Sequence, residues 1–251
     1  MSARSGRREA FEKGRGTRVF VAGVAVLAAV LALLAACGGG ERAGAPGKAA
    51  AGPAVKPGLE VLLETRLDLL RGKRVGLITN QTGVDRSLRT TIDRFQAEPG
   101  IELVALYGPE HGVRGNAQAG EYVPFYFDDK FGLPVFSLYG QSMKPDPGML
   151  KDIDEYMRSF DTVAAGKAPE SAMVEGIDVM VFDVQDVGTR VYTYVATMAY
   201  AMQAAAEAGV EFVVLDRPNP VNGVGLEGPI LEYPQYSSFI GLFPIPERHG
   251  M

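Results

Sequence analysis

The chain has 251 residues, of which 47% are hydrophobic and 22% charged, and its formal net charge at pH 7 is −5. This composition is that of a globular protein and excludes a mainly disordered one, because it supplies enough apolar side chains for a core. Residues 1–36 are net positive, so the rest of the chain is more acidic than the total suggests. An acidic body argues against nucleic acid as a partner bound through a basic patch.

Residues 1–36 have the pattern of an export signal. A basic stretch ends at Arg18, and an uncharged apolar run fills residues 19–36. The run closes with Leu-Ala-Ala before Cys37, which resembles the lipobox of bacterial lipoproteins, where the cysteine is acylated after cleavage. The alternative is an uncleaved membrane helix, because the run is about long enough to span a bilayer. We expect cleavage, with lipidation at Cys37 and a protein held on the bacterial cell envelope, in the periplasm or on the outer face.

The segment 37–58 is rich in glycine, alanine and proline and is predicted to be a flexible tether. The folded domain is expected over residues 59–251. Because Cys37 is the only cysteine, this domain contains no internal disulfide and depends on packing alone for its stability.

Short apolar runs alternate with helical patterns along the domain. Leucines at helical spacing in residues 59–70 predict an opening helix. Residues 194–208 predict another helix, which Gly209 stops. The apolar runs are uninterrupted, as expected for strands covered on both faces of a parallel sheet. They occupy residues 75–78, 103–106, 135–138, 179–182 and 212–215. The alternation predicts an α/β fold with a doubly wound, mostly parallel sheet.

Polar and glycine-rich clusters follow all five of these runs. In doubly wound sheets, ligands bind beyond the carboxyl ends of the strands. The clusters are therefore predicted to converge on one site, and they lie at residues 79–83, 107–112, 139–141, 183–188 and 216–220. Two regions depart from this rhythm. The mixed-charge segment 152–175 is interpreted as an insertion, and residues 243–246 resemble a loop.

Residues 108–112, Gly-Pro-Glu-His-Gly, combine two groups that can transfer protons. The glycines let the backbone turn sharply and approach a ligand. A carboxyl group on Glu110 beside the imidazole of His111 suits proton transfer, and glycoside hydrolysis needs an acid to protonate the leaving oxygen. The alternative is that both side chains only brace the loop, and the residues alone favour neither interpretation.

The region from Asp183 to Tyr194 offers carboxylates, an amide, a guanidinium and hydroxyls, which suit a sugar that carries a carboxylate. Asp186 could instead cap a helix. Asp216 and Arg217 could form an internal ion pair that fixes the following turn. The sequence has only two histidines and none of the usual zinc, dinucleotide, nucleoside triphosphate or serine-hydrolase motifs. We therefore expect neither a metal nor a cofactor.

Six motifs resemble the NamZ-type exo-β-N-acetylmuramidases, a family of glycoside hydrolases. They are Gly-Leu-Ile-Thr-Asn-Gln-Thr-Gly (76–83), Gly-Pro-Glu-His-Gly-Val-Arg-Gly (108–115), Phe-Asp-Val-Gln-Asp-Val-Gly-Thr-Arg (182–190), Leu-Asp-Arg-Pro-Asn-Pro (215–220), Leu-Glu-Gly-Pro (226–229) and Pro-Glu-Arg-His-Gly-Met (246–251). They occur in the family's order.

The resemblance implies a Rossmann-like domain that helps release terminal N-acetylmuramic acid from the non-reducing end of peptidoglycan-derived saccharides. Glu110 is then the implied catalytic acid with His111 beside it, and an arginine near the pocket would meet the lactyl carboxylate. The other implied substrate-binding residues are Asn80, Gln81, Arg114, Asp183, Gln185, Asp186, Arg190, Tyr192, Asp216, Arg217 and His249.

The resemblance also implies a smaller C-terminal domain after the Arg-His-Gly-Met motif, and we expect this domain to be missing here. The alternative function is therefore a non-catalytic envelope lipoprotein that binds wall fragments.

Overall fold

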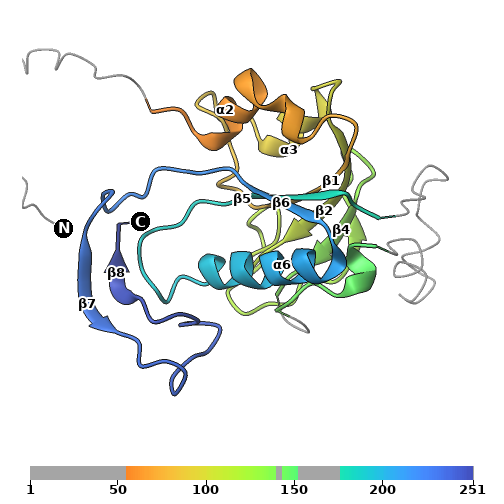
Figure 1. Ribbon diagram of the computed structural model, residues 1–251. Helices are drawn as coiled ribbons and strands as arrows, with labels where there is room; N and C mark the ends of the chain where they lie inside the picture. Colours follow the sequence, from red (N-terminus) through yellow and green to blue (C-terminus); the bar gives the residue numbers. More distant parts are fainter. Residues whose placement is uncertain (1–54, 140–142, 152–175, 251) are drawn as a thin grey trace, which may run out of the picture. The chain divides into compact units, whose positions relative to one another are not determined.

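A computed structural model describes residues 55–139, 143–151 and 176–250 (Figure 1). The expected signal, Cys37, most of the tether and the segment 152–175 lie outside these residues. Among the residues described, no helix combines the length and the apolar character needed to cross a membrane.

Six strands form one sheet, in the order β3-β4-β2-β1-β5-β6. All neighbouring pairs are parallel except β3 with β4. The strands are β1 (Arg74–Thr79), β2 (Glu102–Gly108), β3 (Tyr126–Phe127), β4 (Pro134–Ser137), β5 (Val179–Asp183) and β6 (Glu211–Val214). The five predicted strands and the α/β, doubly wound, mostly parallel sheet are therefore confirmed.

The strand order reverses beside β1. The chain moves outward from β1 to β2 and β4, and it then returns to place β5 and β6 on the other side of β1. The register between β1 and β5 is unbroken from Val75↔Val179 to Thr79↔Asp183. Such a reversal is a topological switch point, where the loops beyond the strands separate and leave room for a ligand. Asn80 and Asp183 stand at this point.

Each face of the sheet has its own apolar layer. Leu77 and Val181 pack with α2 (Gly58–Thr65) and α3 (Thr91–Gln96), whereas Ile78 and Phe182 pack on the side of α6 (Tyr194–Ala208). Figure 1 shows α2 and α3 on one side of the sheet and α6 on the other. Neighbouring residues of one strand thus point into different layers.

The predicted opening helix is present but shorter than its leucine pattern. Leu59 and Leu62 of α2 are buried, and the helix ends before Arg66, after which Leu67–Leu69 form a 3-10 turn. Another short 3-10 turn spans Pro147–Met149. α6 has the predicted bounds, and Gly209 ends it in the left-handed region with φ 66°. The amides of Gly209 and Val210 both hydrogen-bond Ala205, which closes the last turn.

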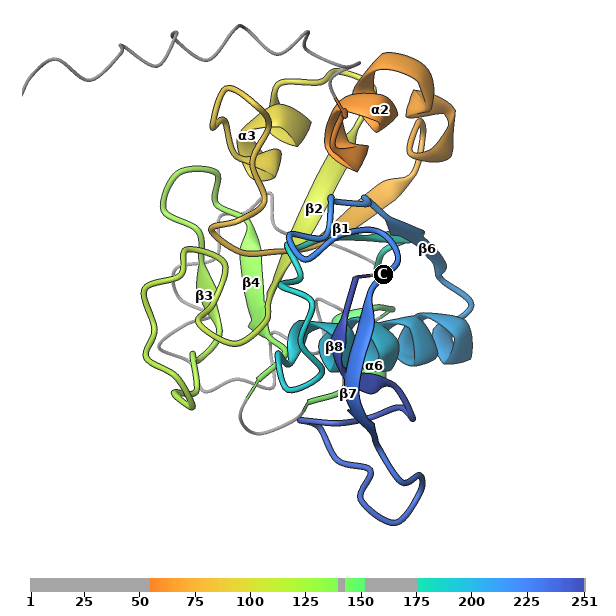
Figure 2. The ribbon, with the colours of Figure 1, turned by 90° about the vertical axis from the view of Figure 1, so that its left-hand side faces the viewer.

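A second, two-stranded antiparallel sheet pairs β7 (Leu226–Ile230) with β8 (Pro246–His249). This hairpin stands beyond the carboxyl ends of the large sheet (Figure 1) and faces the viewer in Figure 2. The loop-like interpretation holds for residues 243–245, but Pro246 already begins β8. The sequence analysis did not predict this hairpin.

Candidate functional site

Loops from four strands are hydrogen-bonded to one another at the carboxyl edge of the sheet. The backbone amide of Gln185, after β5, donates to the Thr82 hydroxyl, after β1, at 3.0 Å. The Gln185 side-chain amide donates to the Pro218 carbonyl, after β6, at 3.0 Å. The Tyr194 hydroxyl donates to the backbone carbonyl of Glu110, after β2, at 3.3 Å. The predicted convergence is confirmed for these four loops, and most of the fifth predicted cluster, 139–141, lies outside the described residues.

Glu110 presents a partly exposed carboxylate with both oxygens oriented. Its Oε1 accepts from the backbone amide of Gly120 at 3.1 Å, and its Oε2 accepts from the Thr193 hydroxyl at 3.0 Å. Burial, and then the Glu110 carboxylate, raise the pKa of the Tyr139 hydroxyl, which places Tyr139 beside this group. Within the described ranges, no lysine or arginine forms an ion pair with Glu110. This carboxylate is therefore held in place by neutral donors, with no arginine or lysine as a counter-charge.

The backbone conformation around Glu110 accounts for the glycines of this loop and for the direction in which the His111 ring points. A Cβ on Gly108 would come within 3.1 Å of Gly112 Cα and Val113 N, a tight contact to backbone atoms that glycine avoids. His111 adopts φ 72°, and its Nδ1 lies 3.0 Å from the Ala117 carbonyl. The imidazole thus bonds within its own loop, and a direct role in proton transfer stays a prediction.

Asn80 and Gln81 follow β1 at the switch point. Asn80 is buried, and its Oδ1 accepts from the amide and the hydroxyl of Thr82 at 2.9 and 2.6 Å. The Asn80 Nδ2 atom has no hydrogen-bond partner. Gln81 is exposed and lies against Gly115, where a Cβ would meet its side chain at 2.4 Å. These residues join the loop after β1 to the loop that carries Glu110.

Asp183 and Arg217 form a buried ion pair. Arg217 donates from Nε to Oδ1 at 2.6 Å and from Nη2 to Oδ2 at 3.0 Å, and the Thr91 hydroxyl also donates to Oδ2. Arg217 further donates to the Val84 carbonyl at 3.1 Å. Asp183 is fully buried, so these bonds use both of its oxygens inside the protein. The neighbouring Asp216 is exposed at the end of β6.

Arg190 and Tyr192 precede α6. Arg190 Nη1 donates to the carbonyls of Pro229 and Ile245 at 2.9 and 2.7 Å, and its Nη2 pairs with Glu247 at 2.7 Å. It therefore fastens the β7–β8 hairpin. The Tyr192 ring meets the Tyr194 ring edge-on, with centroids 4.6 Å apart. Burial, and then the Tyr192 neighbour, raise the pKa of the Tyr194 hydroxyl.

Asp186 and His249 lie side by side in the lining of a cavity beside α6. His249 Nε2 lies 3.9 Å from Asp186 Oδ2, which is too long for a hydrogen bond, and Oδ2 instead accepts from the Gly188 amide at 2.8 Å. The cavity has a volume of about 360 Å³ and is bounded by α6, β6 and the segment before β8. Tyr194 lies in its wall, and the Tyr194 hydroxyl also donates to the backbone carbonyl of Glu110.

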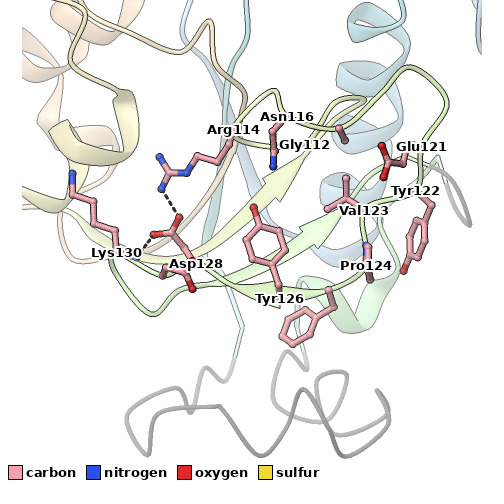
Figure 3. Close-up of a pocket in the computed structure, with 13 residues that line it drawn as sticks. Gly112, Arg114, Asn116, Glu121, Tyr122, Val123, Pro124, Tyr126, Asp128 and Lys130 are labelled. Atoms are coloured by element: carbon pink, nitrogen blue, oxygen red, sulfur yellow. Dashed lines mark hydrogen bonds and ion pairs between the residues drawn. The ribbon is translucent and has the colours of Figure 1, made fainter.

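Arg114 lies on a wider groove of about 620 Å³ along the loop that follows Glu110 (Figure 3). Its guanidinium pairs with the buried Asp128, as the dashed line in Figure 3 shows. The aromatic rings of Tyr122, Phe125 and Tyr126 also line the groove, and aromatic faces of this kind can contact sugar rings.

All three predicted arginines are paired within the protein, and they differ in exposure. The Arg114 side chain is 36% exposed, against 12% for Arg190 and 8% for Arg217. Arg114 is thus the one open to a ligand. No group of three or more histidine, cysteine, aspartate or glutamate residues in the described part could hold a metal ion.

The structure also adds three residues that the sequence analysis did not select. Thr193 bonds the Glu110 carboxylate, Tyr194 bonds its carbonyl, and Tyr139 lies beside it. The run of hydroxyls before α6 was the available signal for Thr193 and Tyr194. For Tyr139, the available signal was its place in the cluster 139–141, which follows an apolar run.

These features define a class of protein, a Rossmann-like α/β domain with its site at the switch point. A polar, incompletely paired cluster there is typical of ligand-binding and enzyme domains. The chain belongs to the family described as "Exo-beta-N-acetylmuramidase NamZ, N-terminal", whose model matches residues 75–166 and 158–251.

Individual relatives agree with this assignment. The chain is 51% identical over 199 residues to "Peptidoglycan beta-N-acetylmuramidase NamZ" of Bacillus subtilis (strain 168), which covers 79% of this chain and 42% of the relative. Two crystal structures of DUF1343 family proteins from Bacteroides fragilis NCTC 9343 also match. They have TM-scores of 0.63 and 0.57 at 46% and 32% identity, over 79% of this chain and 44% of each of theirs. The chain thus spans less than half the length of these relatives.

Proposed function

We propose that this protein is an exo-acting glycoside hydrolase that releases terminal β-linked N-acetylmuramic acid from the non-reducing end of peptidoglycan fragments. Glu110 is the general acid in this proposal. Support comes from the family and from the name of the Bacillus subtilis relative, a peptidoglycan β-N-acetylmuramidase.

The observation that carries the proposal is the state of the carboxylates at the edge of the sheet. Asp183 is neutralised by Arg217 and fully buried, and Asp128 is buried against Arg114. Glu110 is partly exposed and held by neutral donors, the Gly120 amide and the Thr193 hydroxyl. Asp186 and Asp216 are also free of arginine and lysine ion pairs in the described part, but they line the separate cavity beside α6. A proton donor must reach the glycosidic oxygen and must not be bound permanently to a cation. Glu110 meets both conditions.

The groove along the loop that follows Glu110 suits the rest of the saccharide. Its aromatic rings offer flat apolar faces, and Arg114 is exposed enough to grip the lactyl carboxylate while still bonded to Asp128. The two features lie on the loop that continues from Glu110, so one fragment can contact both.

The test is release of a chromogenic aglycone from a β-N-acetylmuramic acid glycoside. Glu110→Gln keeps the size of the side chain but removes the acid, and it is expected to lower kcat by about 100-fold or more. Glu102→Gln, the same change at the opposite edge of the sheet, is the control and is expected to leave kcat unchanged. Full activity in Glu110→Gln would refute the role of Glu110. Fragment binding without turnover by the unmodified protein would favour the wall-binding lipoprotein instead.

We also propose that the protein is anchored to the cell envelope by lipid on Cys37. The support is the basic, apolar and small-residue order of residues 1–37. Cells fed a labelled fatty acid are expected to label the protein, and Cys37→Ser is expected to abolish the label. Labelling of the Cys37→Ser protein, or no labelling of the unmodified one, would contradict the anchor.

A further inference from the structure

In the described part of the chain, buried polar atoms without a hydrogen-bond partner occur at the carboxyl edge of the sheet. Four buried side-chain atoms there have no hydrogen-bond partner: Asn80 Nδ2, Asp186 Oδ1, and both ring nitrogens of His249. A buried polar group without a partner loses its hydration with nothing in return, so a fold keeps few of them. All four atoms belong to residues that follow β1 or β5 or end β8. Their concentration at this edge indicates groups that await a ligand.

Asp186 and His249 line the cavity of about 360 Å³ beside α6. His249 is 4% exposed, and it is too far from Asp186 for the two side chains to satisfy each other. The remaining walls are mostly apolar and include Val195, Met198 and Phe243. The cavity thus presents a carboxylate oxygen and an imidazole within an apolar surface.

This combination fits a small secondary amide with a methyl group. The amide N–H can donate to Asp186 Oδ1, and the amide carbonyl can accept from a ring N–H of His249. The methyl group can lie against the apolar walls, where it is removed from water. A free ammonium group fits poorly, because it would lose its hydration against these walls and leave the imidazole donor unpaired.

One wall residue of the cavity is bonded to the backbone of the proposed acid. Tyr194 lies in the cavity wall, and its hydroxyl bonds the Glu110 carbonyl at 3.3 Å. We propose that this cavity binds the 2-acetamido group of the sugar whose glycosidic bond Glu110 protonates. Asp186 and His249 hold the amide, and Met198 and Val195 pack on its methyl group. This inference rests on the proposed function for the identity of the sugar.

The test compares binding of N-acetylmuramic acid with binding of muramic acid, which has a free amine, by isothermal titration calorimetry. The unmodified protein is expected to bind the acetylated sugar at least about tenfold more tightly, because the amine has no carbonyl to accept from His249 and no methyl group to lie against the apolar walls. Met198→Trp fills the cavity and is expected to remove this preference. Met202→Trp is the matched control, since Met202 is exposed one turn further along α6 and does not line the cavity. The control is expected to keep the preference.

A second variant keeps the test decisive if the Met198→Trp protein does not fold. His249→Phe keeps a ring in the wall and removes both nitrogens, and it is also expected to abolish the preference. Equal binding of the two sugars by the unmodified protein, or an unchanged preference in a folded Met198→Trp or His249→Phe protein, would overturn the proposal. Because the readout is binding, an absence of hydrolysis would count against the proposed function and not against this cavity.

Discussion

The Asp183–Arg217 pair shows how one residue at the edge of the site can serve the fold. Asp183 has no exposed surface, and Arg217 and Thr91 use both of its oxygens. The pair ties the end of β5 to the loop after β6, and through the Val84 carbonyl to the loop after β1. Its contribution to the site is to fix the loops that carry Asn80 and Gln185.

Asp183→Asn is expected to lower the free energy of unfolding by about 3–5 kcal/mol, because it leaves the Arg217 charge buried without a counter-charge. Urea unfolding measures this change. Glu227→Gln is the control, since Glu227 pairs with Arg248 at the surface. That loss is expected to be at most about 1 kcal/mol. Equal stability of Asp183→Asn and the parent would show that the pair does not support the fold.

The sequence could predict the place of the candidate site but not the pairing of its side chains. Polar residues after buried strands lie at one edge whatever their neighbours are, so the convergence of the loops follows from strand direction alone. Whether Asp183 faces a ligand or Arg217 depends on the β5–β6 spacing and the path of the loop after β6. The left-handed backbone of His111, which turns its ring toward Ala117, depends likewise on the closed loop.

Among the elements, the strands and α6 were predictable because their own residues build the core. Uninterrupted apolar runs specify β1, β2, β4, β5 and β6, and the alanine-rich pattern before Gly209 specifies α6. The β7–β8 hairpin has no such signal. β7 is exposed along its whole length and contains a glycine and a proline, so its position depends on contacts from elsewhere in the chain.

The Arg190 side chain makes three polar contacts to this hairpin and the segment before β8, so Arg190→Ala is expected to loosen the hairpin. The variant loses bonds to the Pro229 and Ile245 carbonyls and to Glu247, while the core layers stay intact. Amide hydrogen exchange of Leu226–Ile230 and Pro246–His249 is expected to accelerate by about tenfold or more, and exchange in β1 and β5 to change little. Arg66→Ala, which removes an exposed arginine paired with Asp68, is the control. Equally faster amide exchange in the hairpin and in the six-stranded sheet would show that the Arg190 contacts do not act on the hairpin alone.

At the scale of the whole molecule, the two edges of the sheet are built differently. The carboxyl edge carries the unpaired groups of Asn80, Asp186 and His249. The amino edge is closed by ion pairs, of which Arg74–Asp178 joins the starts of β1 and β5. Asp178 accepts from the Arg74 amide at 2.8 Å and from its guanidinium at 3.2 and 3.1 Å. Ion pairs thus stabilise both edges, since Asp183–Arg217 lies at the carboxyl edge, whereas the unpaired groups named here lie at the carboxyl edge only.

This arrangement predicts a loss of stability in acid. Hydrogen bonds from Arg74 hold the pKa of Asp178 below its usual range, and Lys130 and Arg86 do the same for Asp93 and Glu60. A carboxyl with a lowered folded-state pKa binds its proton more readily in the unfolded chain. Its stabilising effect is therefore complete above the unfolded value of about 4 and is lost as the pH falls through the folded value.

The thermal unfolding midpoint is accordingly expected to be nearly constant from about pH 7 to pH 5 and to fall steeply below about pH 4. Asp178→Asn removes one of these carboxyls, so its midpoint is expected to be lower at neutral pH and to approach that of the parent as the pH falls. Glu102→Gln, at the same amino edge, is expected to follow the parent curve. If the unfolding midpoints of Asp178→Asn and the parent differed by the same number of degrees at every pH, the Arg74 contact would not be the source of the acid sensitivity.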